Sequence, residues 1–380
     1  MKPVAATIYA LHMPFTEAFE HSAKERTFGD SVVIRVRDEV GTEGFGEGVP
    51  RPYVTGETAD WMVEHLACDL WPAVVEREVP PLRDAADLEA LDAFIPQQEI
   101  PGVLSDNASR AALELALLDC VLRRQGLSAG QILRPRRQRV IYSGVITAGA
   151  LDKALQHARQ MKLVGLKYIK VKVGMADDVA RLRALRAALG PEVSLRIDAN
   201  GAWTLEQAIA TLNALAPCNI AAVEQPLARG PIADLVRLKQ ATPVPLMVDE
   251  SLVTLADAEA LISHQAVDYF NVRVSKCGGL SRSLAMARRA ARAGIQVQVG
   301  SQVGETAILA AAGRHLAAAL EDVAFVEGSY GTLLLTEDIS ADGVRFGHRG
   351  EAPLLTGPGL GIRVLEERLH KYARKIVSLS

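Results

Sequence analysis

The chain has 380 residues, of which 49% are hydrophobic and 23% charged, and its formal net charge is −3. This length is enough for two domains and a large core, and the interspersed charges indicate neither nucleic acid nor an anionic membrane as a partner. No apolar run approaches the ~20 residues of a membrane span, the N-terminus lacks a signal-peptide core, and the four cysteines form no regular framework. We therefore expect a cytoplasmic protein.

Residues 1–135 are expected to form an α+β domain. A strand over 4–13 and a hairpin within 31–48 are separated by a polar segment, 15–28, whose simplest interpretation is a surface loop. Helices are predicted over 57–75, 85–94 and 107–125. The sheet of this domain has an incomplete edge, so the C-terminal tail, about 355–380, is expected to return to it.

Strands and helices then alternate over residues 136–354. Strands are predicted near 140–146, 167–173, 193–198, 221–224, 245–249, 268–274, 295–300 and 323–327, with helices between them. Eight such strands make a barrel, whereas about six would suit an open sheet. The predicted fold class is therefore α/β, a modified (β/α)8 TIM-type barrel with an N-terminal α+β capping domain.

The most informative stretch is the short apolar strand at 168–174, which contains two lysines. Lys170 and Lys172 are two positions apart, so they point to the same side of the strand. Two neighbouring ammonium groups lower each other's affinity for a proton, and a lysine so placed can act as a base near neutral pH. The alternative is a pair of solvated lysines on an edge strand.

Ionisable residues also end the next four predicted strands. After Lys172 come Asp198, Glu224, Asp249 and Lys276, each about 26 residues beyond the previous one. A βαβ crossover occupies roughly 30 residues, so this spacing fits one group per barrel strand. A charge at the carboxyl end of successive parallel strands is how a β/α barrel builds an active site.

Three converging carboxylates need a cation to remain ionised together. Oxygen ligands without His or Cys favour Mg²⁺ or Mn²⁺ over Zn²⁺, although the acids could instead pair with lysines in a structural network. A metal flanked by Lys172 and Lys276 suits the removal of a proton α to a metal-bound carboxylate, with electrostatic stabilisation of the resulting enediolate.

The motifs Lys170-Val171-Lys172, Asp198-Ala199-Asn200, Glu224-Gln225-Pro226, Asp249-Glu250-Ser251 and Lys276-Cys277-Gly278-Gly279 together resemble the enolase superfamily, muconate-lactonizing subgroup. The resemblance implies that Lys172 is the base, Lys170 its partner and Lys276 the acid/base on the other face. It also implies that Asp198, Glu224 and Asp249 bind the metal and that Asn200 contacts substrate. The expected activity is that of an isomerase, either a cycloisomerase or a racemase/epimerase. Two alternatives are a lyase of the same superfamily, such as a dehydratase or an o-succinylbenzoate synthase-like enzyme, and a non-enzymatic scaffold.

At two positions the chain lacks residues that other subgroups of the family carry, which narrows the subgroups that it can resemble. No His follows the seventh barrel strand, where the mandelate racemase subgroup has one, and no Asp-x-Asp pair follows the eighth, where dipeptide epimerases carry it. Glu327 resembles the acid that cycloisomerases have there, although a locally paired carboxylate is the alternative.

Substrate choice in this family lies in two capping loops, here 15–28 and 51–57. His21, Arg51 and Tyr53 are their polar candidates for contact with a small carboxylic acid, along with Lys24. A homo-oligomer is expected.

Overall fold

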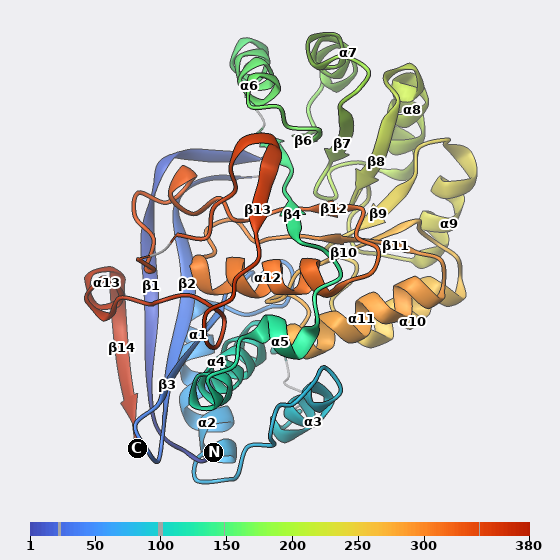
Figure 1. The fold of residues 1–380 in the computed structure, drawn as a ribbon. Coiled ribbons are helices and arrows are strands. Elements are labelled where there is room, and N and C mark those ends of the chain that lie inside the picture. The colour runs from blue at the N-terminus through green and yellow to red at the C-terminus, as the bar shows by residue number, and fades with distance from the viewer. Residues whose placement is uncertain (22–23, 98–101, 148, 342) are drawn as a thin grey trace.

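The computed structural model describes residues 1–21, 24–97, 102–147, 149–341 and 343–380. Figure 1 shows a long antiparallel sheet beside the first helices, and next to it a parallel sheet surrounded by the later helices. The fold is an α/β barrel with an N-terminal antiparallel capping sheet. None of the described helices has both the length and the apolar character needed to cross a membrane.

The capping sheet joins the two ends of the chain. Its strand order is β14-β1-β2-β3, and the C-terminal β14 runs antiparallel to β1. Its strands are β1 (Pro3–His21), β2 (Lys24–Asp38), β3 (Glu43–Gly48) and β14 (Ala373–Leu379). The helices beside it are α1 (Ala59–His65), a π-helical turn (Leu66–Leu70), α2 (Trp71–Val74), α3 (Asp87–Phe94), α4 (Asn107–Gln125), α5 (Ala129–Leu133) and α13 (Glu366–Tyr372).

The segment 15–28 differs from the expected loop. Its described residues extend β1 and β2, which pair as far as Pro14 with Phe28 and, after an irregularity, Phe19 with Arg26. Backbone hydrogen bonding between the two strands therefore continues where the polar sequence suggested a loop. The hairpin extension carries this segment towards the barrel.

Close packing of β3 on α4 holds the capping sheet against its longest helix. Alternate residues of β3 are glycines, and α4 presents alanines four residues apart to them. A Cβ at Gly46 would overlap the carbonyl oxygen of Ala112, and the same holds one turn away on either side. Only glycine lets the two backbones approach this closely.

Eight parallel strands form the barrel in the order β12-β11-β10-β9-β8-β7-β6-β5. A hydrogen bond from Ser143 N to Val326 O, 2.8 Å, joins the two ends of the sheet. The strands are β5 (Gly144–Ile146), β6 (Tyr168–Lys172), β7 (Ser194–Asp198), β8 (Ile220–Glu224), β9 (Leu246–Val248), β10 (Tyr269–Val272), β11 (Gln296–Val299) and β12 (Phe325–Val326). The helices around them are α6 (Leu151–Leu163), α7 (Asp178–Leu189), α8 (Leu205–Leu215), α9 (Ile232–Ala241), α10 (Leu255–Ser263), α11 (Leu280–Arg292) and α12 (Ala307–Ala319).

The first predicted barrel strand, 140–146, is in fact two short strands. β4 (Arg139–Ile141) pairs antiparallel with β13 (Glu351–Pro353), and only β5 belongs to the barrel. Tyr142 N, between them, donates to Gly350 O at 2.8 Å. The chain thus leaves one sheet before it joins the other, a break that its apolar sequence does not reveal.

Buried glutamates connect the capping domain to the barrel. Glu114 of α4 accepts hydrogen bonds from the backbone of Leu280 and Ser281, at 2.6 and 2.8 Å, at the start of α11. Glu47 of β3 accepts from Thr306 and Leu309 at the start of α12. Carboxylates stabilise helix N-termini, whose first N–H groups otherwise lack partners. These contacts fix the capping domain over one end of the barrel.

Candidate active site

A cavity of about 500 Å³ lies between the capping domain and the carboxyl ends of the barrel strands. The barrel contributes lysines, carboxylates and Arg273 to its floor, whereas the capping domain contributes Arg26, Arg51 and Tyr53. Apolar side chains from the segment 333–335 line another part of the wall. The cavity therefore combines an ionised floor with a partly apolar wall, as small-molecule sites usually do.

Both lysines of β6 border this cavity, as the alternation of the strand predicts. Lys172 Nζ donates to Asp198 Oδ2 and to Asn200 Oδ1, both at 2.7 Å. Lys170 Nζ donates to Glu327 Oε2 at 2.7 Å and lies 3.3 Å from Glu224 Oε2. The strand is not an edge strand with solvated lysines, because β5 and β7 pair with it on either side.

The expectation that the two lysines lower each other's pKa is wrong for Lys170. Burial by itself lowers the pKa of Lys170, but the carboxylates of Glu224, Glu327 and Asp198 outweigh burial and raise the pKa above its ordinary value. The pairing of acids with lysines, which was considered as an alternative, outweighs the repulsion between the two lysines at Lys170. Lys170 is therefore held as an ammonium ion.

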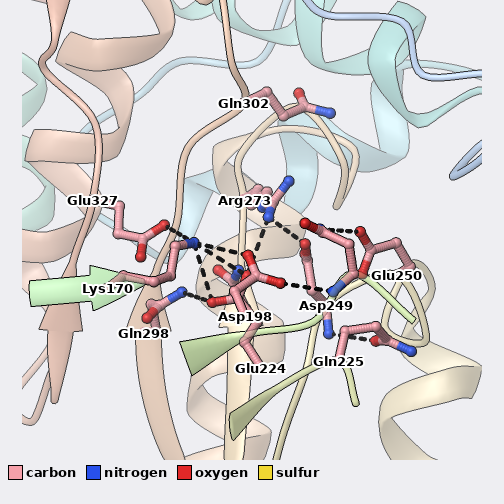
Figure 2. Close-up of polar contacts among 12 residues, drawn as sticks. Lys170, Asp198, Glu224, Gln225, Asp249, Glu250, Arg273, Gln298, Gln302 and Glu327 are labelled. Atoms are coloured by element: carbon pink, nitrogen blue, oxygen red, sulfur yellow. Dashed lines mark hydrogen bonds and ion pairs between the residues drawn. The ribbon is translucent and has the colours of Figure 1, made fainter. Parts of the chain in front are cut away.

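Asp198 and Glu224 are the last residues of β7 and β8 and are paired in register, and Asp249 directly follows β9. All three are buried and lie next to the cavity through neighbours that line it, such as Lys170, Lys172 and Arg273. Lys170 and Arg273 lie among them (Figure 2). Burial and the charge of Asp198 raise the pKa of Glu224 to about 6. Burial raises the pKa of Asp198 too, but Lys172 and Lys170 lower it further, below its ordinary range.

The three carboxylates suit a hard divalent cation in their donor chemistry. Within the described chain no group of three acidic, histidine or cysteine side chains is arranged as a metal cluster. In this structure the cations Lys170 and Arg273 neutralise the carboxylates, with Arg273 ion-paired to Asp249 Oδ2. The buried carboxylate oxygens are nevertheless the hard donors that a divalent cation prefers, so the set fits a metal ion.

Lys276 is buried and is not among the described residues that line the cavity. Its side chain is 1% exposed, and Nζ donates to Asp249 O, Asp249 Oδ1 and Asn271 O at 2.7, 2.9 and 2.8 Å. These three bonds use all three donors of an ammonium group. Lys276 therefore fixes the position of Asp249.

Arg273 is the cation that reaches the cavity from the β10 side. Its guanidinium contacts Asp249 Oδ2 and lies 3.3 Å from Glu224 Oε1 (Figure 2). Sequence reasoning missed this residue because the predicted strand extended to 274, whereas β10 ends at Val272. The sequence did contain an indication of this residue: Asn271 and Arg273 are two positions apart, as Lys170 and Lys172 are, so they point to the same side of the predicted strand.

Glu327 borders the cavity, but both of its oxygens are paired within the barrel. Oε2 accepts from Lys170, and Oε1 accepts from Arg196 Nη2 at 2.8 Å. Burial raises the pKa of Glu327, while the charges of Lys170 and Arg196 lower it to below the ordinary value. Arg196 was not anticipated, although it lies two residues before Asp198 on the same strand. The local pairing considered for Glu327 is present in the structure.

Asn200 and Glu250 form a further polar pair at the cavity. Asn200 Nδ2 donates to Glu250 Oε1 at 3.2 Å, and Glu250 Oε2 is buried with no hydrogen-bond partner among the described residues. Burial and the neighbouring Asp249 raise the pKa of Glu250 to about 7. No role was predicted for Glu250 from the sequence, although its position directly after the strand-end acid Asp249 indicated one.

The capping side brings Arg51 and Tyr53 to the mouth of the cavity. Arg51 donates to Pro50 O and to Val303 O, which ties its loop to the segment after β11. Tyr53 is 55% exposed, and Arg26 stands over its ring at 5.9 Å from the centroid. His21 ends β1, and its side chain, like that of Lys24, lies outside the described part of the chain.

Residues 153–368 match the family model described as "Enolase C-terminal domain-like". N-succinyl-L-Arg/Lys racemase of Bacillus cereus is 28% identical over 98% of each chain, and the crystal structure of N-succinyl Arg/Lys racemase from that organism superposes with a TM-score of 0.90 at 26% identity, covering 100% of each chain. D-Ala-D/L-Ala epimerase of Cytophaga hutchinsonii is 31% identical over 93% of this chain and 94% of its own. Muconate cycloisomerase 1-2 of Acinetobacter lwoffii is 31% identical over 92% and 90%.

Proposed function

Because this chain belongs to the enolase superfamily, in its muconate-lactonizing subgroup, we propose that it is a divalent-metal-dependent isomerase that removes the proton α to the carboxylate of a small acid. The relatives that it matches over nearly their full length are isomerases. The observation that carries the proposal is Lys172, which borders the cavity beside three carboxylate-bearing strand ends.

Asp198, Glu224 and Asp249 would hold the metal, which is Mg²⁺ or Mn²⁺. Their hard oxygen donors, buried together at neighbouring strand ends, support this assignment. A dipeptide epimerase from Cytophaga hutchinsonii with a TM-score of 0.87 was crystallised with Mg and a dipeptide. When bound, the ion supplies positive charge that holds the substrate carboxylate and offsets the negative charge that develops on it.

Lys172 is the proposed base. Its hydrogen bonds to Asp198 and Asn200 use two of its three donor positions, so Nζ has a fixed orientation and one direction open to the cavity. The α-proton moves from the substrate carbon to Nζ, and the electron pair passes into the carboxylate to give an enediolate. Holding the base in a fixed position provides much of the rate acceleration of such a proton transfer.

Lys170 plays a different part. Because surrounding carboxylates hold it as an ammonium ion, it is unsuited to accept a proton. Its charge lies on the same side of β6 as Lys172, where it stabilises negative charge on the enediolate. Glu327 keeps Lys170 in place through the 2.7 Å hydrogen bond.

The capping residues are proposed to select the substrate. Arg51 and Tyr53 lie at the mouth with Arg26, so the distal part of the acid meets two cations and an aromatic ring. His21, which lies in the β1–β2 hairpin with Arg26, remains a candidate for substrate contact. We also propose a homo-oligomeric enzyme of the reducing cytoplasm, in accord with its four free cysteines.

Solvent exchange tests this function directly. The enzyme is incubated in D₂O with Mg²⁺ and a library of α-substituted carboxylic acids, and deuterium at the α-carbon is measured by mass spectrometry. At least one acid is expected to acquire the label, and chelation is expected to stop its labelling. Absence of label from the whole library would contradict the proposal.

A further inference from the structure

We infer that Arg273, rather than Lys276, is the β10-side cation that faces the substrate, so that protons are transferred on one face of the substrate only. This rests on the proposed function, in which Lys172 is the base. Three features of the described residues lead to it: the position of Lys276, the position of Arg273, and the chemistry that distinguishes a guanidinium from an amine.

Lys276 is not placed to exchange a proton with a ligand. Its ammonium is enclosed, and its three hydrogen bonds go to oxygens of Asp249 and Asn271. To reach the cavity it would have to break all three and release Asp249, one of the proposed metal ligands. Leaving those acceptors unpaired in a buried site is costly. Lys276 is therefore a positioning residue.

Arg273 occupies the place opposite Lys172. β6 and β10 are four strands apart in an eight-stranded barrel, with the acid-bearing ends of β7, β8 and β9 between them. Arg273 directly follows the last residue of β10 and lines the cavity. Its Nε is buried with no hydrogen-bond partner among the described residues, so a donor remains for a ligand.

The two cations differ in what they can do to a proton. A guanidinium stays protonated in proteins, whereas an amine can give up and accept a proton. A racemase that works through two bases needs a proton acceptor on each face of the α-carbon. Among the described residues that line this cavity, the lysines are Lys170 and Lys172, both on β6. Arg273 can only hold charge on the opposite face.

One-sided proton transfer fits β-elimination and its reverse. Lys172 takes the α-proton, the C–H electron pair forms the enediolate, and the enediolate expels a substituent from the β-carbon. The carbon–substituent bond breaks with its electron pair on the leaving group, a double bond forms, and the carboxylate is regenerated. When the leaving group stays tethered, as in the opening of a lactone ring, the product is an isomer. This separates the chain from relatives named as racemases and epimerases and groups it with those named as muconate cycloisomerases.

The test follows α-deuterium labelling in D₂O with Mg²⁺ for both enantiomers of N-succinyl-arginine, whose α-carbon is stereogenic. Muconolactone, whose α-carbon is a CH₂ group, is the second probe, and for it the measurement is which of the two α-hydrogens is exchanged. The wild-type enzyme is expected to label one enantiomer at least about 100-fold faster than the other, the lower end of a general base's contribution, without interconverting them. Arg273→Lys, which supplies an amine, is expected to add labelling of the second enantiomer. The matched variant Arg273→Gln supplies no amine and is not expected to label the second enantiomer. Lys276→Gln is expected to slow the reaction while the preferred enantiomer stays the same.

Interconversion of enantiomers by the wild type at the rate of labelling would overturn the inference. Selective loss of labelling of one enantiomer in Lys276→Gln would do so too. A crystal structure with Mg²⁺ and muconolactone gives a readout independent of activity: Arg273 should face the ligand with Lys276 still bonded to Asp249 and Asn271, and a contact from Lys276 to the ligand would refute the assignment. Failure of the proposed function is distinguishable, because it would appear as undiminished labelling in Lys172→Ala.

Discussion

Lys172 Nζ donates to Asp198 Oδ2 at 2.7 Å, so the proposed base is hydrogen-bonded directly to a proposed metal ligand. Both groups are buried and lie on neighbouring strands paired in register. Asp198 would therefore hold both the metal and the base, so its position sets the distance between the bound carboxylate and Lys172.

The first prediction concerns the metal ligands. Asp249→Asn is expected to weaken Mn²⁺ binding, measured by electron paramagnetic resonance of free Mn²⁺, by at least about tenfold, because it removes one charge from the set. The thermal midpoint should fall as well, because Asp249 is buried and paired with Lys276 and Arg273, so binding is measured at a temperature where the variant remains folded. Asp152→Asn, at an exposed position on α6, is the control. Unchanged Mn²⁺ affinity in Asp249→Asn would remove this residue from the site.

A second prediction concerns the capping loop. Arg51→Gln removes donors that tie the loop to Val303 O, so the loop should close less often over a bound acid. The expected result is a rise in KM larger than the fall in kcat, because closure precedes proton transfer. Steady-state kinetics on any acid found by exchange measures both constants. A fall in kcat with KM unchanged would instead place Arg51 in the chemical step.

Packing of β3 on α4 gives a stability prediction with a matched control. Gly46→Ala places a methyl group on the Ala112 carbonyl oxygen and should destabilise the fold by about 3 kcal/mol. Gly313→Ala, in the interior of α12 with no atom near the new Cβ, should instead stabilise by about 0.5–1 kcal/mol. Urea unfolding of both variants is the measurement. Equal effects in the two variants would contradict the packing argument.

Stability should also depend on pH through Glu57, which accepts hydrogen bonds at the start of α4. Burial raises its pKa to about 7 from an ordinary value of 4.5. The folded state then binds more protons than the unfolded state between these values, so this group's contribution to stability is present below pH 4.5 and is lost as pH rises to about 7. The loss is on the order of 3 kcal/mol.

Unfolding free energies measured from pH 4.5 to 8 test this dependence. Glu57→Gln should be less stable than the wild type at low pH and should show a shallower decline over the window. Glu64→Gln, at an exposed position of α1, should keep the wild-type slope. A slope in Glu57→Gln as steep as in the wild type would assign the pH dependence to other groups.

Much of the fold followed from the sequence, because barrel strands are short apolar runs at a regular spacing and α4 has a clear start and stop. α4 spans Asn107–Gln125, as predicted, with Gly126 in the left-handed conformation at its end. The split of 140–146 and the hairpin at 15–28 were missed, since both depend on partners far away in the chain.

The site was predictable where a strand end coincides with an ionisable residue. Asp198 and Glu224 are the last residues of β7 and β8, and Lys172 is the last of β6. For β10 the alternating pattern of polar residues and valines continues past Val272, where the strand ends, so counting along the pattern led to Lys276. Three residues separate Arg273, which borders the cavity, from Lys276, which is buried and does not.

Proton removal by Lys172 is the central step of the proposed mechanism. The measurement is incorporation of α-deuterium from D₂O, with saturating Mg²⁺, by the wild type, Lys172→Ala and the surface control Lys153→Ala. Loss of the base should lower labelling by about 10²–10⁴-fold while Mn²⁺ affinity and the thermal midpoint stay near wild type, and Lys153→Ala should label normally. Labelling by Lys172→Ala at the wild-type rate would contradict the account.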